Sequence, residues 1–212
     1  MRTKTLVCAA VLAAGVATTM AQSNVYSLNV VGYYNLPLAA NAKMMIANQL
    51  NTTNNTLGAL IPIAPDSSVF YKYAGSFTTY SYDALTPGWL PNGNATLNPG
   101  EGGFIICPEA TTLTFVGEVL QGSLVNTLPI NTKVIRSSIV PQQGLISTDL
   151  KLPGEDSDVL YTYAAGYTAY SYDALTPGWL PSEPTIGVGQ AFFYLKAPQS
   201  VSSQWIRNFT VQ

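Results

Sequence analysis

Apolar and polar residues alternate in short runs along this chain, which is the period of half-buried β-strands. Gly, Pro, Asn and Asp separate the runs, and helical periodicity over 11 or more residues occurs only near the N-terminus. The pattern predicts an all-β fold with single helical turns at Thr56–Leu60 and Gly144–Leu150. Strands are expected at Tyr26–Asn35, Lys43–Asn48, Ser68–Ala74, Phe77–Asp83, Gly102–Cys107, Thr112–Val119, Leu124–Leu128, Lys133–Ile139, Asp158–Ala164, Tyr167–Asp173, Gln190–Leu195 and Gln204–Val211.

The strand pattern occurs twice. Residues 69–91 align with residues 159–181 at an offset of 90, and Tyr80–Pro91 is identical to Tyr170–Pro181 at all 12 positions. We interpret the mature chain as two tandem copies, 22–117 and 118–212, each with a β-sandwich or barrel-like fold. The junction Gly117–Leu128 alternates and contains no Pro, so it is expected to be a strand running between copies. A short junction favours copies that pack closely, across an apolar interface with approximate two-fold symmetry.

The most strongly repeated segment predicts a tyrosine-rich β-hairpin, for which two loops are compatible with the sequence. A two-residue loop at Gly75-Ser76 would pair Tyr71 with Tyr80. A three-residue loop suits the second copy better, with Gly166 in the left-handed conformation. Because a slip of one residue moves every side chain to the other face, the pattern leaves open whether the tyrosines are exposed.

The first residues have the layout of a secretory signal peptide, 1–21. A basic start, Met1–Lys4, precedes 12 apolar residues at 6–17 and a small-residue cleavage site ending at Ala21. The apolar run is short for a membrane span, so we do not expect an integral membrane protein. We expect an extracellular or cell-surface protein, and the periplasm is the alternative location. Cleavage removes Cys8 and leaves Cys107 without a disulfide partner; its apolar neighbours predict a buried thiol.

Composition narrows the possible functions. Charged residues make up 9% of the chain, against about 25% in typical soluble domains. Cleavage leaves 9 less 2 basic residues against 11 acidic ones, a net charge of −4, which argues against nucleic acid as a partner. The chain contains no His, which excludes Ser-His-Asp catalysis and His metal ligands. No cofactor is expected.

The repeated segment also carries the candidate ligand-binding residues. Trp89 and Trp179 follow Pro-Gly in identical contexts, and an exposed Trp could stack on a sugar ring beside the Tyr-Ser-Tyr-Asp run. The candidate site therefore comprises Tyr80, Tyr82, Asp83, Trp89, Tyr170, Tyr172, Asp173 and Trp179. The alternative is structural: each Trp fills a small β core, and each Asp accepts hydrogen bonds from turn amides.

One cluster of acidic residues lies in the second copy. Glu155, Asp156 and Asp158 lie within four residues and could offer oxygens to Ca²⁺. The ordered calcium-loop spacing is absent, and the first copy has a single acid at the corresponding place. A solvated loop is therefore favoured over a metal site.

Each copy follows one order: a strand after Leu-Pro, a helical turn, a Tyr-rich hairpin, a Trp, a Pro-Gly-Glu-Gly-Phe-like strand entry and a Thr-rich last strand. This order resembles a β-rich module of exported bacterial proteins that have no assigned activity. The resemblance is carried by Leu36–Ile46, Leu97–Phe104 and Thr185–Phe193. It implies export and a β fold, and it transfers no catalytic residues. The opening departs from the module, because Lys43-Met44-Met45 and Lys133-Val134-Ile135 stand where Asn-Leu-Ile is usual.

Three functions are compatible with these observations. The first is a non-enzymatic structural or adhesive protein outside the cell, with extracellular polysaccharide or other cell-surface proteins as partners. The second is a bivalent carbohydrate-binding module built on the candidate residues. The third, a secreted hydrolase, is disfavoured because no His is present and no pair of acids is repeated.

The expected signal peptide leads to a first testable prediction. Expressed in a secreting bacterial host, the protein should lose residues 1–21 and begin at Gln22, because the small residues before it suit signal peptidase. Intact-mass measurement of the secreted protein tests this, and a mature chain that still begins at Met1 would contradict it.

Overall fold

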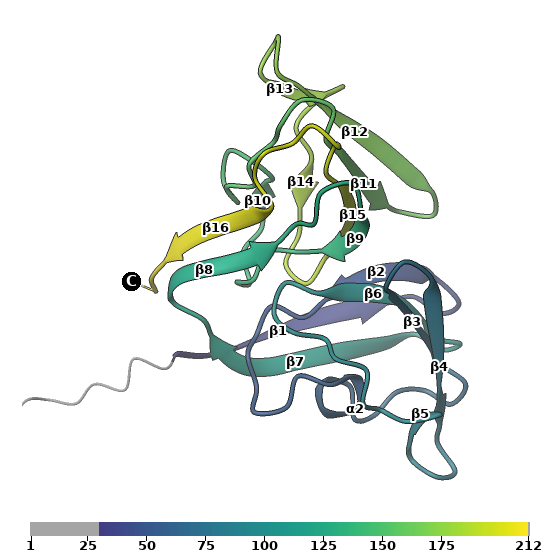
Figure 1. The fold of residues 1–212 in the computed structure, drawn as a ribbon. Coiled ribbons are helices and arrows are strands. Elements are labelled where there is room, and N and C mark those ends of the chain that lie inside the picture. Colours follow the sequence, from purple (N-terminus) through teal and green to yellow (C-terminus); the bar gives the residue numbers. More distant parts are fainter. Residues whose placement is uncertain (1–29, 212) are drawn as a thin grey trace, which may run out of the picture.

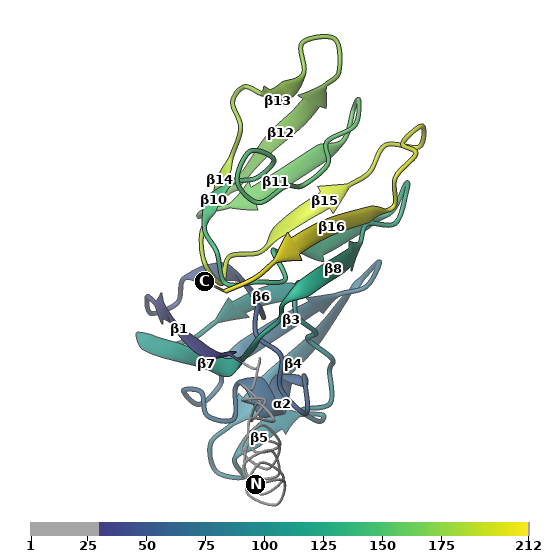
Figure 2. The ribbon, with the colours of Figure 1, turned by 90° about the vertical axis from the view of Figure 1, so that its left-hand side faces the viewer.

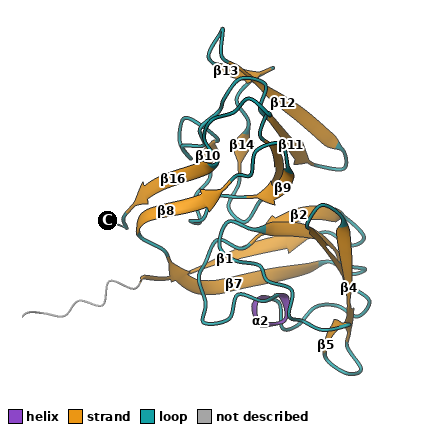
Figure 3. Cartoon of the chain, in the orientation of Figure 1, coloured by secondary structure: helices purple, strands orange, loops and turns teal. Residues whose placement is uncertain are grey.

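The computed structural model describes residues 30–211, whose regular elements are antiparallel strands and one short helix, α2 (Leu57–Leu60) (Figure 3). The expected all-β class is confirmed. The strands are β1 (Val30–Leu38), β2 (Lys43–Ala47), β3 (Val69–Tyr73), β4 (Phe77–Asp83), β5 (Gly88–Leu90), β6 (Gly102–Ile106), β7 (Thr111–Val119), β8 (Gly122–Thr127), β9 (Lys133–Arg136), β10 (Gly144–Leu145), β11 (Val159–Tyr163), β12 (Tyr167–Asp173), β13 (Gly178–Leu180), β14 (Thr185–Ile186), β15 (Phe192–Leu195) and β16 (Gln204–Phe209). The expected signal peptide, and residues 26–29 of the first expected strand, lie outside the described residues.

The strands form two five-stranded sheets with the same order. The first sheet is β2-β6-β3-β4-β5, and the second is β9-β15-β11-β12-β13. The register also agrees, since Val69 lies opposite Ser81 in the first hairpin and Val159 lies opposite Ser171 in the second. We call β1–β7 with α2 unit 1, and β8–β16 unit 2. The repeated sequence segments therefore form the same strands in the same register.

The hairpin loops have three residues in both units. Tyr73 pairs with Phe77, and Tyr163 pairs with Tyr167, which excludes the two-residue loop at Gly75-Ser76. The middle loop residue takes the left-handed conformation in both, with φ of 78° at Gly75 and 60° at Ala165. The expectation of Gly166 in that conformation is wrong, because register places Ala165 at the middle of the loop.

A two-stranded ribbon covers the outer face of each sheet. β1 pairs with β7 over unit 1, and β16 pairs with β8 over unit 2. Strand β1 shows how the sequence specifies this layer, because Tyr34, Leu36 and Leu38 alternate inward while the residues between them face solvent. Ribbon, sheet and helix enclose a hydrophobic core in unit 1, and unit 2 has a separate core of its own.

The inner faces of the two sheets pack against each other. Unit 1 lies on one side of this contact and unit 2 on the other (Figures 1 and 2). A third core fills the contact, and we call it the interface core: Met45, Ala47, Phe104, Ile135, Ala191 and Phe193, with four half-buried tyrosines around it. The apolar interface expected between the copies is therefore present. The interface core also explains why Phe104 and Ile105 are both fully buried. Neighbouring residues in a strand face opposite sides of the sheet, and this sheet is covered on both sides.

Contacts across the interface occur in exchanged pairs. Isolated β-bridges join Ile46 to Gln190 and Arg136 to Glu101. Ile46 and Arg136 are equivalent positions of the repeat, as are Glu101 and Gln190, so the two bridges are the same contact with the units exchanged. Gly102 and Ala191 are also equivalent, and here the units differ. A Cβ added to Gly102 would lie 2.5 Å from the Ile46 carbonyl oxygen of its own unit and 2.6 Å from the Cβ of Ala191, so this place has no room for a second methyl group.

Several local expectations are corrected. The junction is not one strand: β7 ends at Val119, β8 begins at Gly122, and each pairs within its own unit. The division after residue 117 therefore falls inside β7. Gly144–Leu150 is strand β10 followed by turns, not a helical turn, whereas α2 lies where a turn was expected. Strands β5, β10, β13 and β14 were not expected, because each has only two or three residues.

Among the described residues, no helix has the length and apolarity that crossing a membrane would require.

The interface makes a prediction about stability. A fragment of residues 22–120 would expose Met45, Ala47 and Phe104 to water, so it should unfold at a lower temperature than the mature chain. The mature chain should unfold in one cooperative transition, because neither unit buries its inner sheet face alone. Calorimetry on both proteins measures this. Equal midpoints would show that the units are independent.

Candidate functional site

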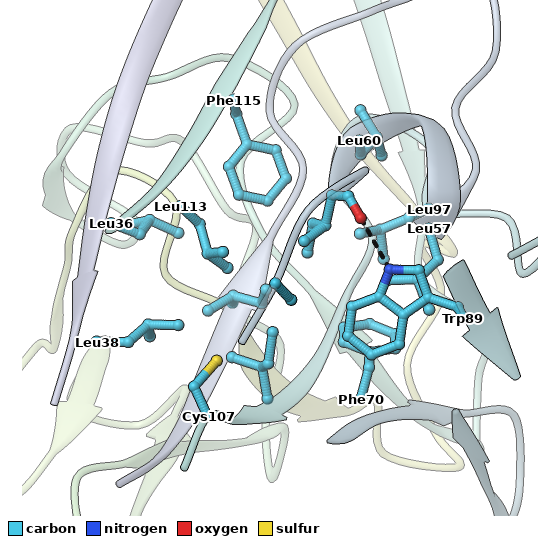
Figure 4. Packing of buried hydrophobic residues seen from close by; sticks show 14 of the residues in the cluster. Leu36, Leu38, Leu57, Leu60, Phe70, Trp89, Leu97, Cys107, Leu113 and Phe115 are labelled. Atoms are coloured by element: carbon cyan, nitrogen blue, oxygen red, sulfur yellow. Dashed lines mark hydrogen bonds between the residues drawn. The ribbon is translucent and has the colours of Figure 1, made fainter. Parts of the chain in front are cut away.

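The two repeated tryptophans are core residues. Trp89 is 3% exposed and Trp179 is 4% exposed. The Trp89 indole N–H donates to the Ile61 carbonyl at 2.8 Å, within the packing shown in Figure 4, and Trp179 donates to Ser147 Oγ at 2.8 Å. The expectation that they form stacking platforms is wrong, because an indole ring enclosed in the core presents no face to a ligand.

The tyrosines of the candidate site do not form an exposed ladder. Tyr82 is buried, and its hydroxyl donates to the Pro62 carbonyl at 3.0 Å. Tyr80 and Tyr170 are half-buried and pack against the cores of their own units. Tyr172 is the member that lines a cavity, of about 370 Å³, at the outer end of unit 2. Sequence repetition therefore marks residues that stabilise each unit.

Asp83 and Asp173 stabilise turns. Asp83 Oδ1 accepts from the Leu85 amide at 2.8 Å, and Oδ2 accepts from the Thr86 hydroxyl at 2.6 Å. Asp173 makes the same two bonds, at the same distances, with Leu175 and Thr176. These hydrogen bonds hold the pKa of both carboxyls below the usual value, and the bond from the threonine hydroxyl has the largest effect. The structural alternative considered for these residues is the one observed.

Two of the three acids in the acidic segment of unit 2, Glu155 and Asp158, belong to an ion network, whereas Asp156 is exposed as a solvated loop would have it. Asp158 and Lys196 are both fully buried, and Lys196 Nζ donates to Asp158 Oδ2 at 2.7 Å. Lys196 also bonds Glu155 at 2.9 Å. The Asp158 oxygens also accept from the Tyr194 and Ser200 hydroxyls and from the Glu155 and Ala197 amides. Every lone pair that burial removes from water is thereby compensated.

In unit 1, uncharged residues occupy the positions equivalent to this ion pair. Ser68 and Cys107 occupy the places equivalent to Asp158 and Lys196, and both are fully buried. Cys107 is a free thiol, as expected, and burial raises its pKa against the effect of a hydrogen bond with Ser68. The ion pair is therefore a feature of unit 2 and is not required by the fold.

The carboxyl groups of the network have lowered pKa values. Burial opposes ionisation of Asp158, but hydrogen bonds from Lys196, Ala197 and Tyr194 outweigh it and hold the pKa of the carboxyl low. The pKa of Glu155 is also lowered, by Val201, Lys196 and Ser202 against the effect of burial. Among residues 30–211, no group of acids and Cys could hold a metal ion.

The accessible aromatic surface lies where the two units meet. Six rings contact one another there and form what we call the aromatic cluster: Tyr73, Phe77, Phe104, Tyr163, Tyr167 and Phe193. Phe104 and Phe193 form its base, with centroids 6.0 Å apart. Tyr73 meets Phe193 edge-on at 5.1 Å, and Tyr163 meets Phe104 edge-on at 5.2 Å, again as an exchanged pair.

The outer rings of the aromatic cluster face solvent. Phe77 is 45% exposed and Tyr167 is 54% exposed, although both contact the buried base. Burial raises the pKa of Tyr167, with a further contribution from Tyr163. A cavity of about 280 Å³ opens between these rings and Lys133.

Two lysines flank the cluster at equivalent positions. Lys133 Nζ lies 4.4 Å from the Tyr161 ring centroid and 4.9 Å from that of Phe193. Lys43 Nζ lies 4.3 Å from the Phe104 centroid and 5.2 Å from that of Tyr71. Lys43 also lines a second cavity, of about 490 Å³, with Tyr163 and Gln190.

Sequence reasoning missed the aromatic cluster, although its residues lie in the segments that it singled out. The hairpin register was left open, and that register decides which face Tyr73 and Phe77 occupy. A sequence signal was available: aromatic residues stand at equivalent positions of the repeat, Tyr73 with Tyr163, Phe77 with Tyr167 and Phe104 with Phe193.

The ion network makes a prediction about folding. Lys196→Met should destabilise the protein by about 3 to 5 kcal/mol, because Asp158 would remain buried without its cation. The double variant Asp158→Ser with Lys196→Cys reproduces the neutral pair of unit 1 and should recover much of that loss. Urea unfolding at pH 7 measures both. A double variant as unstable as the single one would contradict the compensation argued here.

The same variants test pH dependence. A lowered pKa in the folded state means that Asp158 stabilises the fold fully above the unfolded carboxyl pKa of about 3.9, and that this contribution is lost as pH falls through the folded pKa. As the pH is lowered below 5, the urea midpoint of the wild-type protein should therefore fall more steeply than that of the double variant. Parallel curves would show that the network does not set acid sensitivity.

No family model, curated protein or solved structure matches this chain. A proposal about its function therefore rests on the aromatic cluster, its two lysines and the cavities beside them.

Proposed function

We propose that this protein is an exported, non-enzymatic adhesive protein that binds extracellular polysaccharide through the aromatic cluster. The observation that carries the proposal is the pair of half-exposed rings, Phe77 and Tyr167, mounted on a buried aromatic base at the junction of the units. We further infer that units 1 and 2 are copies of one duplicated segment, related by an approximate two-fold axis that passes through this junction. The shared sheet order and the exchanged contacts support that inference.

The geometry suits a sugar for physical reasons. The C–H faces of a pyranose are apolar and pack well on aromatic rings, while its hydroxyls need water or polar partners at the edge. Rings that are already fixed by edge-to-face contacts lose little conformational entropy when a ligand arrives. Phe77 contacts Tyr71 and Tyr73, and Tyr167 contacts Tyr163, so both outer rings are held in this way.

The composite surface revises the second function considered from the sequence. A bivalent module would carry one complete site in each unit, centred on Trp89 and Trp179, and both of these residues are buried. The aromatic cluster instead takes three rings from each unit and forms one continuous surface. We propose a single composite site, which depends on the two units being packed together.

Export and the absence of catalysis complete the proposal. The signal-peptide layout at 1–21 supports secretion to the cell exterior. The lack of His, and the commitment of Glu155 and Asp158 to Lys196, support a binding role over hydrolysis. Other cell-surface proteins remain the alternative partners, since exposed aromatic rings also anchor protein interfaces.

Sedimentation with insoluble polysaccharides tests the proposal. Phe77→Ala and Tyr167→Ala should each weaken binding roughly tenfold, the equivalent of about 1.4 kcal/mol, because each removes a stacking face. Tyr33→Ala is the matched control: Tyr33 is 73% exposed on β1, away from the aromatic cluster, and its loss should leave binding unchanged.

Equal weakening by all three variants, or binding that none of them alters, would show that the aromatic cluster is not the binding surface. Failure of the wild-type protein to bind any of the polysaccharides would count against the proposed function itself. Near-ultraviolet circular dichroism of each variant checks that the interface remains packed.

A further inference from the structure

We infer that the polysaccharide bound at the aromatic cluster is anionic and carries uronate residues, whose carboxylates are met by Lys43 and Lys133. This inference rests on the function proposed above and names the chemical class of the ligand.

The first step concerns the surroundings of the two lysines. Lys43 begins β2 and Lys133 begins β9, so both ammonium groups lie at the edge of an inner sheet face. The described contacts of Lys43 are with the rings of Tyr71, Phe77 and Phe104, and those of Lys133 are with Tyr161 and Phe193. All of these residues come from the strands that form or face the aromatic cluster.

The second step is that neither lysine is neutralised. In the part of the chain that the structure describes, the salt bridges use Lys72 with Glu101, and Lys196 with Glu155 and Asp158. Lys43 and Lys133 therefore carry charge without a carboxylate partner, in a protein whose net charge is negative. An ammonium group has three donors, and a ring face occupies none of them as a conventional hydrogen bond would.

The third step is access. Lys133 lines the cavity of about 280 Å³ together with the exposed rings Phe77 and Tyr167. Lys43 lines the cavity of about 490 Å³, whose walls come from both units and include Tyr163 and Gln190. Each lysine thus combines ring contacts with a place at a concave part of the surface, which is the arrangement of small-ligand sites.

A uronate residue matches both features at once. Its pyranose face is apolar enough to stack on Phe77 or Tyr167, and its carboxylate can accept charge-assisted hydrogen bonds from an ammonium group. A neutral sugar would use the rings and leave the cations unused. Two equivalent lysines on one composite surface favour a polymer with a repeated acidic unit over a single acidic sugar.

The test compares two forms of one polymer. Affinity electrophoresis of the mature protein is run in gels containing polygalacturonate, or the same polymer with its carboxyl groups methyl-esterified. We expect binding to polygalacturonate to be at least about tenfold tighter, and this advantage should shrink as salt rises to about 1 M. The comparison needs no variant, so it stands even if a substitution disturbs folding.

Variants then locate the charge. Lys43→Gln and Lys133→Gln should each reduce the preference for the acidic polymer, and the double variant should bind both forms equally. Lys151→Gln is the control, because it removes the same charge from an exposed lysine of unit 2. The Lys151 ammonium group donates to the Thr148 carbonyl. A third gel containing dextran sulfate separates carboxylate recognition from general attraction to anions.

The outcomes are distinguishable. Equal wild-type binding to both forms of the polymer would overturn the uronate inference and leave the proposed function intact. Binding to dextran sulfate alone, or a loss with Lys151→Gln equal to that with Lys133→Gln, would also overturn it. Binding to neither form, nor to any insoluble polysaccharide, would overturn the proposed function together with this inference.

Discussion

The contact between Phe104 and Phe193 is the one on which the rest of this structure depends. Each ring lies on the strand next to the edge of its sheet. This strand is covered on one face by its own unit's core and on the other face by the other unit. A five-stranded sheet of this size has two apolar faces, and its ribbon can cover only one of them. Removing the second unit would leave the inner face of the first in water. The aromatic cluster exists because that inner contact extends outward to the hairpins.

Much of this fold was predictable from the sequence because its signals are local. Alternation placed β4 and β12 with the observed bounds, and the repeat at an offset of 90 implied that both units share one set of strands. Strands β5 and β13 were not predictable in this way. With three residues each, they are defined by pairing with β4 and β12 and not by a pattern of their own. The order of the strands in the sheets likewise depends on pairing between distant segments.

The site was less predictable, since it depends on tertiary closure. The context Pro-Gly-Trp is the same for an exposed platform and for a core residue, and the Ile61 carbonyl that receives the Trp89 N–H is 28 residues away. Asp158 looked like part of a solvated loop because its partner, Lys196, lies 38 residues further along the chain. The aromatic cluster needs both units and a hairpin register that sequence alone left open. Residue types were visible in each case, but their neighbours were not.

The difference between Gly102 and Ala191 has a consequence for any symmetric assembly of these units. A Cβ at residue 102 would lie 2.5 Å from the Ile46 carbonyl oxygen and 2.6 Å from the Ala191 Cβ, so an alanine does not fit on both sides without displacement. Two copies of unit 2 arranged in the same way would bring two alanines together at this place, whereas two copies of unit 1 would bring two glycines. Neither unit paired with itself therefore reproduces the contact that the two different units make in one chain.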